Sequence, residues 1–534
     1  MSFISFQFIV FMAVVTLLYY LVPKKYQWVL LLIASYGFFL YGGVTPLIFI
    51  LSTTLTVYGG GRWMEHVKAT AASKKAAKAT NRRILTLITV FNFGILLMLK
   101  YYNFFAESVN HGLGVFAYDS QLPLINIVLP LGISFYTFQS IGYLIDVYRN
   151  KYAAEKSLPR FALFISYFPI LVQGPISRYN DLGTQLREEH QFDYRTFKFG
   201  MQLALWGFFK KMVIADRIGT AVSTVFGDYA QFDGFQTGLA IILYALQIYL
   251  DFSGGIDIAR GCSEMLGITL MENFQRPYFG NTVSEYWRRW HIALTSWMRD
   301  YVFFPLTLSK FSNKVGKWGR KHIKGSIGKQ LPSYFPTFVT FFLIGVWHGA
   351  GWGFIVFGLY NATIIVVSMI LTPVFQRMIK FFHINEKSFG WKVFQIARTF
   401  LIMAAGKTLT RASSVHVAVA MLKRVVGIKT AAYAGASSAT AAAAEALAST
   451  GAAGLPVFSA MGLDLGNWIV LFVTFALFFT VSVLQERGME MRETLAAKPF
   501  YVRWIVYLLG FAAVVILGVY GPGYSASEFV YRNF

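Results

Sequence analysis

The sequence has little charge and almost no cysteine. Of its 534 residues, 14% are Asp, Glu, Lys or Arg and 56% are hydrophobic, whereas soluble globular proteins carry about a quarter charged residues. The single cysteine, Cys262, excludes an internal disulfide framework and a thiolate metal cluster. Uncharged runs such as Phe3 to Val22 approach the roughly 20 residues that cross a bilayer. We therefore predict an all-α, polytopic membrane protein.

Several common catalytic motifs are also absent. The sequence contains no Gly-x-x-x-x-Gly-Lys-Ser/Thr loop, no Gly-x-Gly-x-x-Gly after a strand and no His-Glu-x-x-His. Neither a metal site nor a permanently bound cofactor is expected. Asp251 and Asp257 are six positions apart and do not share a helix face. A paired-carboxylate acid/base device is therefore not predicted.

The positive charge is concentrated between the hydrophobic runs. There are 48 Lys and Arg against 25 Asp and Glu, a net charge of +23. One cluster lies in residues 62–83 and another in residues 310–329. The second could attract the phosphates of coenzyme A or an acidic carrier protein, although membrane topology alone explains both clusters. This distribution indicates loops beside a lipid bilayer and gives no reason to expect nucleic acid.

Helix parity and the positive-inside rule agree on the topology. The N-terminal run should remain as a membrane helix with its N-terminus outside, because it is too long for a signal-peptide core. Two more crossings place residues 62–83 as a cytoplasmic basic loop. A further membrane helix is expected over Leu122 to Leu144, and the last helix should leave the tail 521–534 outside.

An alanine-rich segment interrupts the C-terminal third. Residues 431–454 are rich in Ala, Ser, Thr and Gly, and the run from Val415 to Val426 has apolar residues at helical spacing beside Lys423 and Arg424. Such a pattern is typical of an interfacial helix. We interpret residues 411–465 as an interfacial, Ala-rich insertion without chemistry of its own.

His348 is the strongest catalytic candidate that the residues alone provide. It lies in a long apolar segment and is flanked by Trp347 and by Gly349 and Gly351, which would let a substrate or another backbone approach the ring. An ionisable group at membrane depth is costly and indicates a functional site. A neutral imidazole there could act as a base, while a histidine that only hydrogen-bonds a neighbouring helix is the alternative.

Two further polar groups of residues stand out. His291 ends a dense polar and aromatic segment that begins at Glu285 and could equally be an interfacial anchor. Asp251 and Ser253 form a polar island at the end of an apolar run.

The polar segments around Asp251, His291 and His348, in this order along the chain, resemble those of the membrane-bound O-acyltransferase (MBOAT) family, bacterial polysaccharide branch. The matching stretches are residues 132–149, 168–178, 251–254, 272–278, 284–291 and 347–349. The resemblance implies a ring of helices around a central tunnel, with the whole chain as one domain. It makes His348 the catalytic histidine and His291 the second conserved histidine. The matched stretches also supply candidate substrate-binding or tunnel residues: Trp287, Arg288, Trp290, Asp251, Ser253, Tyr136, Gln139 and Trp347.

The resemblance also implies an activity. An acetyl group would pass from a cytosolic thioester, with acetyl-CoA as the donor, across the bacterial cytoplasmic membrane for O-acetylation of an extracytoplasmic polysaccharide. An extracytoplasmic acetyltransferase partner would complete the transfer. The imidazole would activate a hydroxyl for attack on the thioester without a metal.

The C-terminal residues 529–534 resemble an aromatic ending, Phe-x-Tyr-x-x-Phe, that this branch shares. The phenol of Tyr531 could carry the acetyl group, because phenyl esters remain activated. Alternatively, the motif is an aromatic anchor at the membrane interface.

The match is imperfect around residues 406–414, where Gly406 and Lys407 stand in place of the expected aromatics. Two other functions stay open at this point. One is D-alanyl transfer from a carrier protein to teichoic acid. The other is a transporter or export channel without chemistry, which would favour inverted repeats that the sequence does not show.

Overall fold

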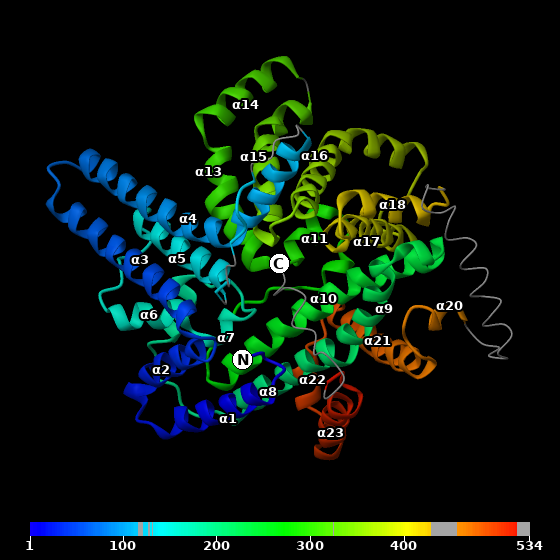
Figure 1. The fold of residues 1–534 in the computed structure, drawn as a ribbon, viewed down its shortest axis with the longest axis horizontal. Coiled ribbons are helices and arrows are strands. Elements are labelled where there is room, and N and C mark those ends of the chain that lie inside the picture. The colour runs from blue at the N-terminus through cyan, green and yellow to red at the C-terminus, as the bar shows by residue number, and fades with distance from the viewer. Residues whose placement is uncertain (116–120, 126–128, 131, 324, 429–455, 521–534) are drawn as a thin grey trace. The chain divides into compact units, whose positions relative to one another are not determined.

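The computed structural model describes residues 1–115, 121–125, 129–130, 132–323, 325–428 and 456–520. These residues are mostly helical and form no strand apart from an isolated bridge between Phe274 and Trp290 (Figure 1). The prediction of an all-α protein is confirmed. The chain divides into two compact units, Met1–Ala204 with Ile256–Glu272, and Leu205–Gly255 with Asn273–Phe534.

The first unit is built from the N-terminal helices. Its elements are α1 (Phe6–Leu21), α2 (Gln27–Leu40), α3 (Val44–Thr70), α4 (Lys74–Val115), α5 (Ile133–Tyr148), α6 (Leu158–Ser166), α7 (Phe168–Leu171), the π-helix η2 (Tyr179–Gly183) and most of α8 (Tyr194–Phe208). The last residues of α10 (Gly234–Met265) also belong to this unit.

The second unit holds the remaining elements. They are the π-helix η3 (Phe209–Ala215), α9 (Asp216–Gly227), η4 (Tyr229–Gln231), the first part of α10, η5 (Pro277–Phe279), α11 (Val283–Arg289), α12 (Ile292–Met298), η6 (Arg299–Phe303), α13 (Phe304–Thr307), α14 (Lys310–His322), α15 (Ser326–His348), α16 (Trp352–Phe381), α17 (Phe389–Arg411), α18 (Val415–Val425), α20 (Pro456–Ser459), α21 (Leu465–Glu486), α22 (Met491–Ala496) and α23 (Phe500–Leu517).

Six helices in the described part of the chain are long and apolar enough to cross a bilayer, namely α3, α4, α10, α16, α21 and α23. Helix α23 carries no buried residue, and its Leu508, Phe511 and Ile516 are exposed. A continuous apolar surface of this kind requires lipid or another apolar partner. The protein is therefore a multi-pass membrane protein, as the composition predicts.

Two local predictions differ from the structure. The helix expected over Leu122 to Leu144 begins only at Ile133, because Gly132 adopts a positive φ of 72° immediately before it. Pro130, two residues earlier, also lacks the N–H group that a helix interior needs. Within the basic segment 62–83, α3 runs to Thr70 and α4 begins at Lys74, so only residues 71–73 lie outside helices; the cytoplasmic placement of the segment stays a prediction.

Helices α15 and α16 pack unusually closely, and this packing fixes the position of His348. A Cβ atom on Gly345 would lie 2.4 Å from the carbonyl oxygen of Phe354, and one on Gly358 would lie 2.3 Å from that of Phe341. Small residues at such contacts let helix backbones approach within membranes. The glycines therefore hold the C-terminal end of α15 against the start of α16.

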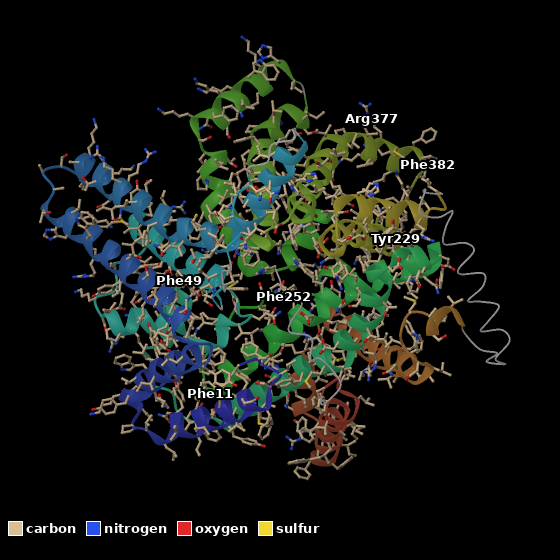
Figure 2. The ribbon with its side chains drawn as sticks, viewed as in Figure 1. Phe11, Phe49, Tyr229, Phe252, Arg377 and Phe382 are labelled. Carbon is tan, nitrogen blue, oxygen red and sulfur yellow. The ribbon has the colours of Figure 1, made fainter. Side chains whose placement is uncertain are left out.

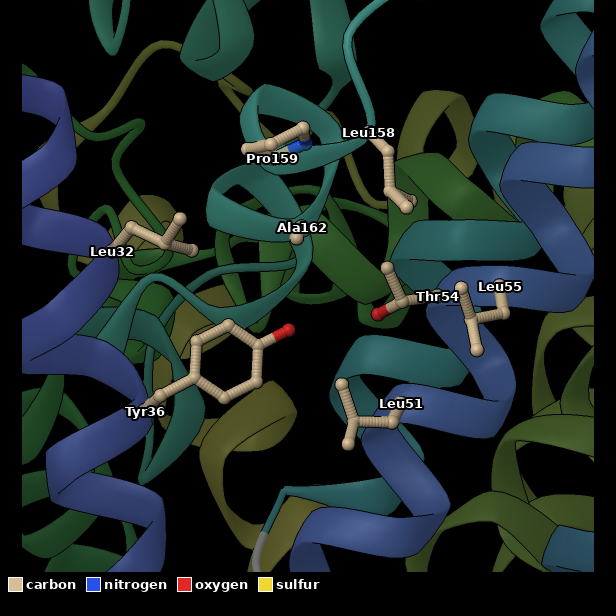
Figure 3. Close-up of a pocket in the computed structure, with 8 residues that line it drawn as sticks. All are labelled: Leu32, Tyr36, Leu51, Thr54, Leu55, Leu158, Pro159 and Ala162. Carbon is tan, nitrogen blue, oxygen red and sulfur yellow. The ribbon is translucent and has the colours of Figure 1, made fainter.

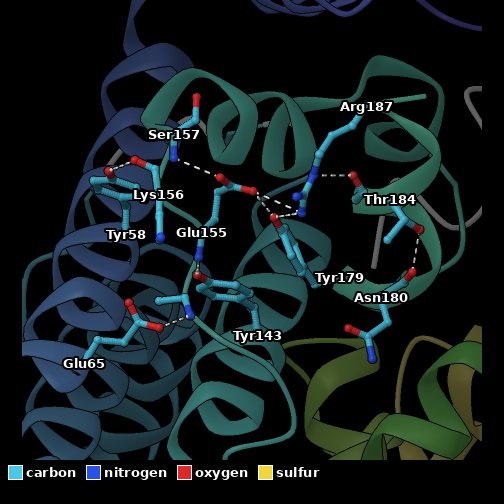
Figure 4. Close-up of polar contacts among 12 residues, drawn as sticks. Tyr58, Glu65, Tyr143, Glu155, Lys156, Ser157, Tyr179, Asn180, Thr184 and Arg187 are labelled. Carbon is cyan, nitrogen blue, oxygen red and sulfur yellow. Dashed lines mark hydrogen bonds and ion pairs between the residues drawn. The ribbon is translucent and has the colours of Figure 1, made fainter. Parts of the chain in front are cut away.

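A buried polar cluster fastens the loop after α5 within the first unit (Figure 4). Glu155 accepts a hydrogen bond from the Tyr179 hydroxyl and lies 3.0 Å from the Arg187 guanidinium. Its other oxygen accepts from the Ser157 N–H at 2.8 Å. Burial alone would raise the pKa of Glu155, but these hydrogen bonds and the charge of Arg187 lower it below its ordinary value. The Glu155 carboxylate is thus charged and paired, and the cluster holds the loop after α5 in place.

A cavity of about 360 Å³ opens between α2, α3 and α6 of the same unit (Figure 3). Its lining is apolar except for the hydroxyl-bearing Tyr36 and Thr54, and includes Leu32, Leu51 and Ala162. No histidine, carboxylate or amine lines it. Its residues therefore supply no group for acyl-transfer chemistry.

Candidate active site

His348 is the last residue of α15 and is 8% exposed. Gly349 follows it with extended backbone, and a Cβ atom on Gly349 would lie 2.3 Å from the Phe354 ring. The space beside the histidine that the glycine provides is therefore occupied by an aromatic side chain of α16. Close approach of a substrate or another backbone to the His348 ring stays a prediction.

His291 lies between α11 and α12 in a left-handed conformation, with φ 47° and ψ 53°. This backbone is sparsely populated for a residue other than glycine and persists only where its surroundings hold it. Asn273 supplies that support. Its side-chain Oδ1 accepts from the Ala293 N–H at 2.9 Å, and its carbonyl accepts from the Ile292 N–H at 3.0 Å.

The same asparagine determines which nitrogen of His291 carries the proton. Asn273 Oδ1 lies 3.2 Å from His291 Nδ1. Since that atom already accepts from Ala293, it is the oxygen, and Nδ1–H must be the donor. In the neutral ring, Nε2 then carries the lone pair. Burial lowers the pKa of His291 to about 3, so the ring is neutral near pH 7 and can accept a hydrogen bond at Nε2.

The two predicted histidines lie close together in the second unit. Their ring centroids are 6.4 Å apart. The Trp347 ring is 5.3 Å from that of His291 and 5.1 Å from that of His348. Phe252, labelled in Figure 2, lies edge-on to His291 at 4.8 Å. The structure thus brings residues 57 positions apart in the sequence, 348 − 291, into one aromatic-walled site.

The neighbouring candidates take different positions. Trp287 is buried and donates from Nε1 to Asn361 Oδ1 at 3.0 Å, which anchors α11 to α16. Trp290 is buried beneath Lys407, whose Nζ lies 3.5 Å from the indole centroid. Arg288, by contrast, is exposed on α11. The tryptophans therefore build the wall of the site, and Arg288 lies at its surface.

Asp251 and Ser253 take part in a buried polar network. Lys211 Nζ lies 2.6 Å from Asp251 Oδ1 and 2.7 Å from Asp216 Oδ1. Lys210 Nζ donates to the Ser253 hydroxyl at 3.0 Å. These contacts join α10 to the π-helix η3. Because Asp251 and Ser253 flank Phe252, the network also fixes the ring that packs against His291.

Other predicted residues are not brought to this site by the described contacts. Tyr136 and Gln139 are buried in α5 of the first unit, where Gln139 Nε2 donates to the Phe164 carbonyl at 2.7 Å. Tyr531, with the rest of the tail 521–534, lies outside the described residues, as does part of the insertion, residues 429–455. Among the residues that are described, no group of three or more His, Cys, Asp or Glu side chains could hold a metal ion.

Sequence reasoning did not single out Asn273, Asn361, Lys211 or Lys407 as contributors to this site. The two lysines could have been recognised in the sequence, because an ionisable residue within an apolar helical segment is costly and marks a candidate functional position. The asparagines left none, because their roles depend on partners far along the chain.

The chain is similar in sequence to a family of membrane proteins and to individual members of it. The sequence profile of the membrane-bound O-acyltransferase family matches residues 153–414. The chain is 34% identical over 402 residues to the probable alginate O-acetylase of Pseudomonas syringae, covering 75% of this chain and 70% of that protein. It is 29% identical over 377 residues to the peptidoglycan O-acetyltransferase of Helicobacter pylori, covering 66% of each.

A third relative differs in the group that it transfers. The chain is 30% identical over 248 residues to the teichoic acid D-alanyltransferase of Bacillus subtilis, covering 45% of this chain and 58% of that protein. The two O-acetylating relatives therefore match a longer part of the chain than this D-alanyltransferase does.

Proposed function

Because the chain belongs to the membrane-bound O-acyltransferase family, we propose that it transfers an acetyl group from cytosolic acetyl-CoA across the membrane for O-acetylation of an extracytoplasmic polysaccharide. The enzyme class, an O-acyltransferase, follows from the family. The acetyl group is favoured because the alginate and peptidoglycan O-acetylating relatives match more of the chain than the D-alanyltransferase does. The donor, the direction of transfer and a separate extracytoplasmic partner that completes acetylation are parts of the proposal.

The pair of buried histidines carries the chemical part of the proposal. The imidazole of His348 takes the proton from an attacking hydroxyl, whose oxygen forms a bond to the thioester carbonyl carbon. The carbon–sulfur bond then breaks, and the proton passes from the imidazolium to the departing thiolate. His291 contributes the lone pair of Nε2 as a second acceptor, which orients the hydroxyl or an amide N–H of the donor. Two rings whose centroids lie 6.4 Å apart suit this division of roles.

We further propose that Tyr531 receives the acetyl group. The C-terminal motif at residues 529–534 ends in Phe-Val-Tyr-Arg-Asn-Phe. An acetyl ester of its phenol keeps enough reactivity to pass the group to a serine of the partner. The donor's thiol is released on the cytoplasmic side, and no metal takes part in the steps described.

Radiolabelled acetyl-CoA and the purified full-length protein in detergent test this function. The wild-type enzyme should acquire label or hydrolyse the donor, His348→Ala should do neither, and Tyr531→Phe should lose the covalent label while still binding donor. His416→Ala is the matched control, because His416 is exposed on α18. Equal labelling of the wild-type and His348→Ala proteins would disprove the catalytic role of His348. Equal labelling of the Tyr531→Phe variant would disprove the relay alone.

A further inference from the structure

A buried lysine lies beside the turn that presents His291. Lys407, on α17, is 2% exposed. Its Nζ lies 3.5 Å from the centroid of the Trp290 ring and 6.0 Å from that of Tyr286. Among the described residues, this ammonium group forms no hydrogen bond or ion pair. Its contacts are therefore the faces of two aromatic rings in the segment that ends at His291.

The neighbouring carboxylates already have cationic partners. Glu285 lies 2.7 Å from Arg289, and Glu486 lies 2.7 Å from Arg276 and 2.8 Å from Arg289. Without a carboxylate partner, burial lowers the pKa of Lys407 well below its ordinary value, and the contact of the charged form with a tryptophan face offsets part of the cost of burial. The retention of such a group within an enzyme site indicates a task that an apolar side chain of the same length would not perform.

Lys407 is held on a rigid support. A Cβ atom on Gly406 would lie 2.5 Å from the Tyr360 ring, and one on Gly353 would lie 2.1 Å from the Leu409 carbonyl oxygen. Helix α17 therefore packs directly against α16, the helix that follows His348. The Thr410 and Tyr244 hydroxyls, 3.0 Å apart, join the end of α17 to α10. The position of the Lys407 amine relative to the site is thus fixed by backbone packing.

Trp290 connects this support to His291. It directly precedes His291, stacks on Tyr286 at 5.4 Å and meets Phe274 edge-on at 5.0 Å. His291 itself adopts a left-handed conformation that depends on its surroundings. A displacement of the Trp290 ring would change the backbone at residue 290 and thereby the direction of the His291 ring.

We propose that Lys407 is a positioning residue for the acyl transfer: its amine, held over the Trp290 ring, fixes the turn that directs His291 Nε2 toward the substrate. This role rests on the proposed function of the two histidines. It acts on the chemical step, because His291 orients the reacting groups, and it leaves donor binding largely unchanged. Lys407 does not touch the reacting atoms.

Kinetics of three full-length variants test the role. Lys407→Met keeps the length of the side chain and removes the amine, so kcat should fall by about ten- to thirty-fold, with KM for acetyl-CoA changed less than about twofold. Lys407→Arg keeps a cation that stacks on aromatic faces, so kcat should recover to within about threefold of wild type. Lys392→Met is the matched control, since Lys392 is exposed on the same helix.

A double-mutant cycle with Trp290→Phe identifies the partner. If Lys407 acts through the indole, the loss in the Lys407→Met/Trp290→Phe double variant should be clearly smaller than the product of the two single losses. Independent effects, a wild-type kcat in Lys407→Met, or equal losses in the Met and Arg variants would each overturn the proposal. If Lys407→Met does not accumulate, the Trp290→Phe variant alone tests the positioning role. A reduced kcat at unchanged KM supports that role, and an unchanged kcat overturns it.

The failure of the proposed function is a separate result, because it appears as normal activity in His348→Ala. A chain in which His348→Ala is inactive and Lys407→Met is normal would retain the acyltransferase mechanism and lose only the positioning role.

Discussion

Asn273→Ala is the substitution that most sharply tests how the site is built. Asn273 Oδ1 accepts from the Ala293 N–H at 2.9 Å and lies 3.2 Å from His291 Nδ1. The alanine removes this shared acceptor while leaving the backbone contact between the Asn273 carbonyl and Ile292. Two buried donors then lose their partner, and the His291 ring loses the contact that sets its tautomer and direction.

The expected magnitude follows from the cost of an unsatisfied buried group. Leaving one such donor unpaired costs about 1–3 kcal/mol. Because about 1.4 kcal/mol corresponds to a tenfold change in rate, loss of the His291 contact should reduce kcat/KM by roughly 5- to 150-fold. The unpaired Ala293 N–H adds a comparable loss of stability, about 1–3 kcal/mol.

The assay is acetyl-CoA turnover by purified full-length protein, together with a thermal unfolding curve for each variant. Asn313→Ala is the control, because Asn313 is exposed on α14 and also makes a side-chain hydrogen bond. Wild-type turnover in the Asn273→Ala variant would refute the orienting role. Reduced thermal stability with unchanged kcat/KM would show that the asparagine serves the fold alone.

Asn273→Asp extends the test to pH. The carboxylate keeps both acceptor contacts but favours the charged form of the ring, so the pKa of His291 should rise from about 3. His291 can orient the reacting groups only while Nε2 is unprotonated, and activity is therefore lost as the pH falls through that pKa. The wild-type enzyme should show no acid limb from His291 between about pH 5 and 8, whereas the aspartate variant should gain one within or near that window. Superimposable pH profiles would contradict the assignment.

Three further outcomes follow from the packing. Lys211→Met removes both ion pairs of the buried network and should destabilise the protein by about 3–5 kcal/mol, more than Asp251→Asn, in thermal unfolding; the reverse order would contradict the bridging role of Lys211. Glu155→Gln should destabilise the protein near neutral pH, because the pKa of Glu155 is lowered in the folded protein. The stability that this carboxylate contributes is present above its unfolded pKa, roughly 4.3, and is lost as the pH falls through the folded pKa. A difference in stability between variant and wild type that persists at low pH would argue against this linkage. Gly349→Ala should reduce kcat at nearly unchanged expression, since its Cβ would lie 2.3 Å from the Phe354 ring; unchanged kcat would show that the ring can move without disturbing His348.

Much of the fold class and the histidine pair could be predicted from the sequence. A low charge content and uncharged runs of membrane length require apolar surroundings, whatever the details of packing. His348 stood out because an ionisable residue in such surroundings is costly, whereas His291 lies in a polar and aromatic segment and was selected through the family resemblance. The described contacts bring these two rings together, and the predicted family is confirmed.

Other features depended on tertiary contacts that no local pattern encodes. The helix expected from Leu122 begins eleven residues later, at Ile133, since Gly132 takes a positive φ there. Asn273 is 18 residues from His291, and its role arises only when the backbone bridge between Phe274 and Trp290 forms. Lys407 could be recognised as an unusual buried cation, but its aromatic partner could be found only from the folded chain.

The most direct test of histidine-dependent transfer across the membrane uses sealed proteoliposomes containing protein of one determined orientation, with radiolabelled acetyl-CoA added only on the cytoplasmic face. We expect acetyl label to appear on the C-terminal tail at the opposite face in the wild-type protein and to be absent from His348→Ala. Label of equal amount in both proteins, or label confined to the face that received the donor, would contradict this expectation.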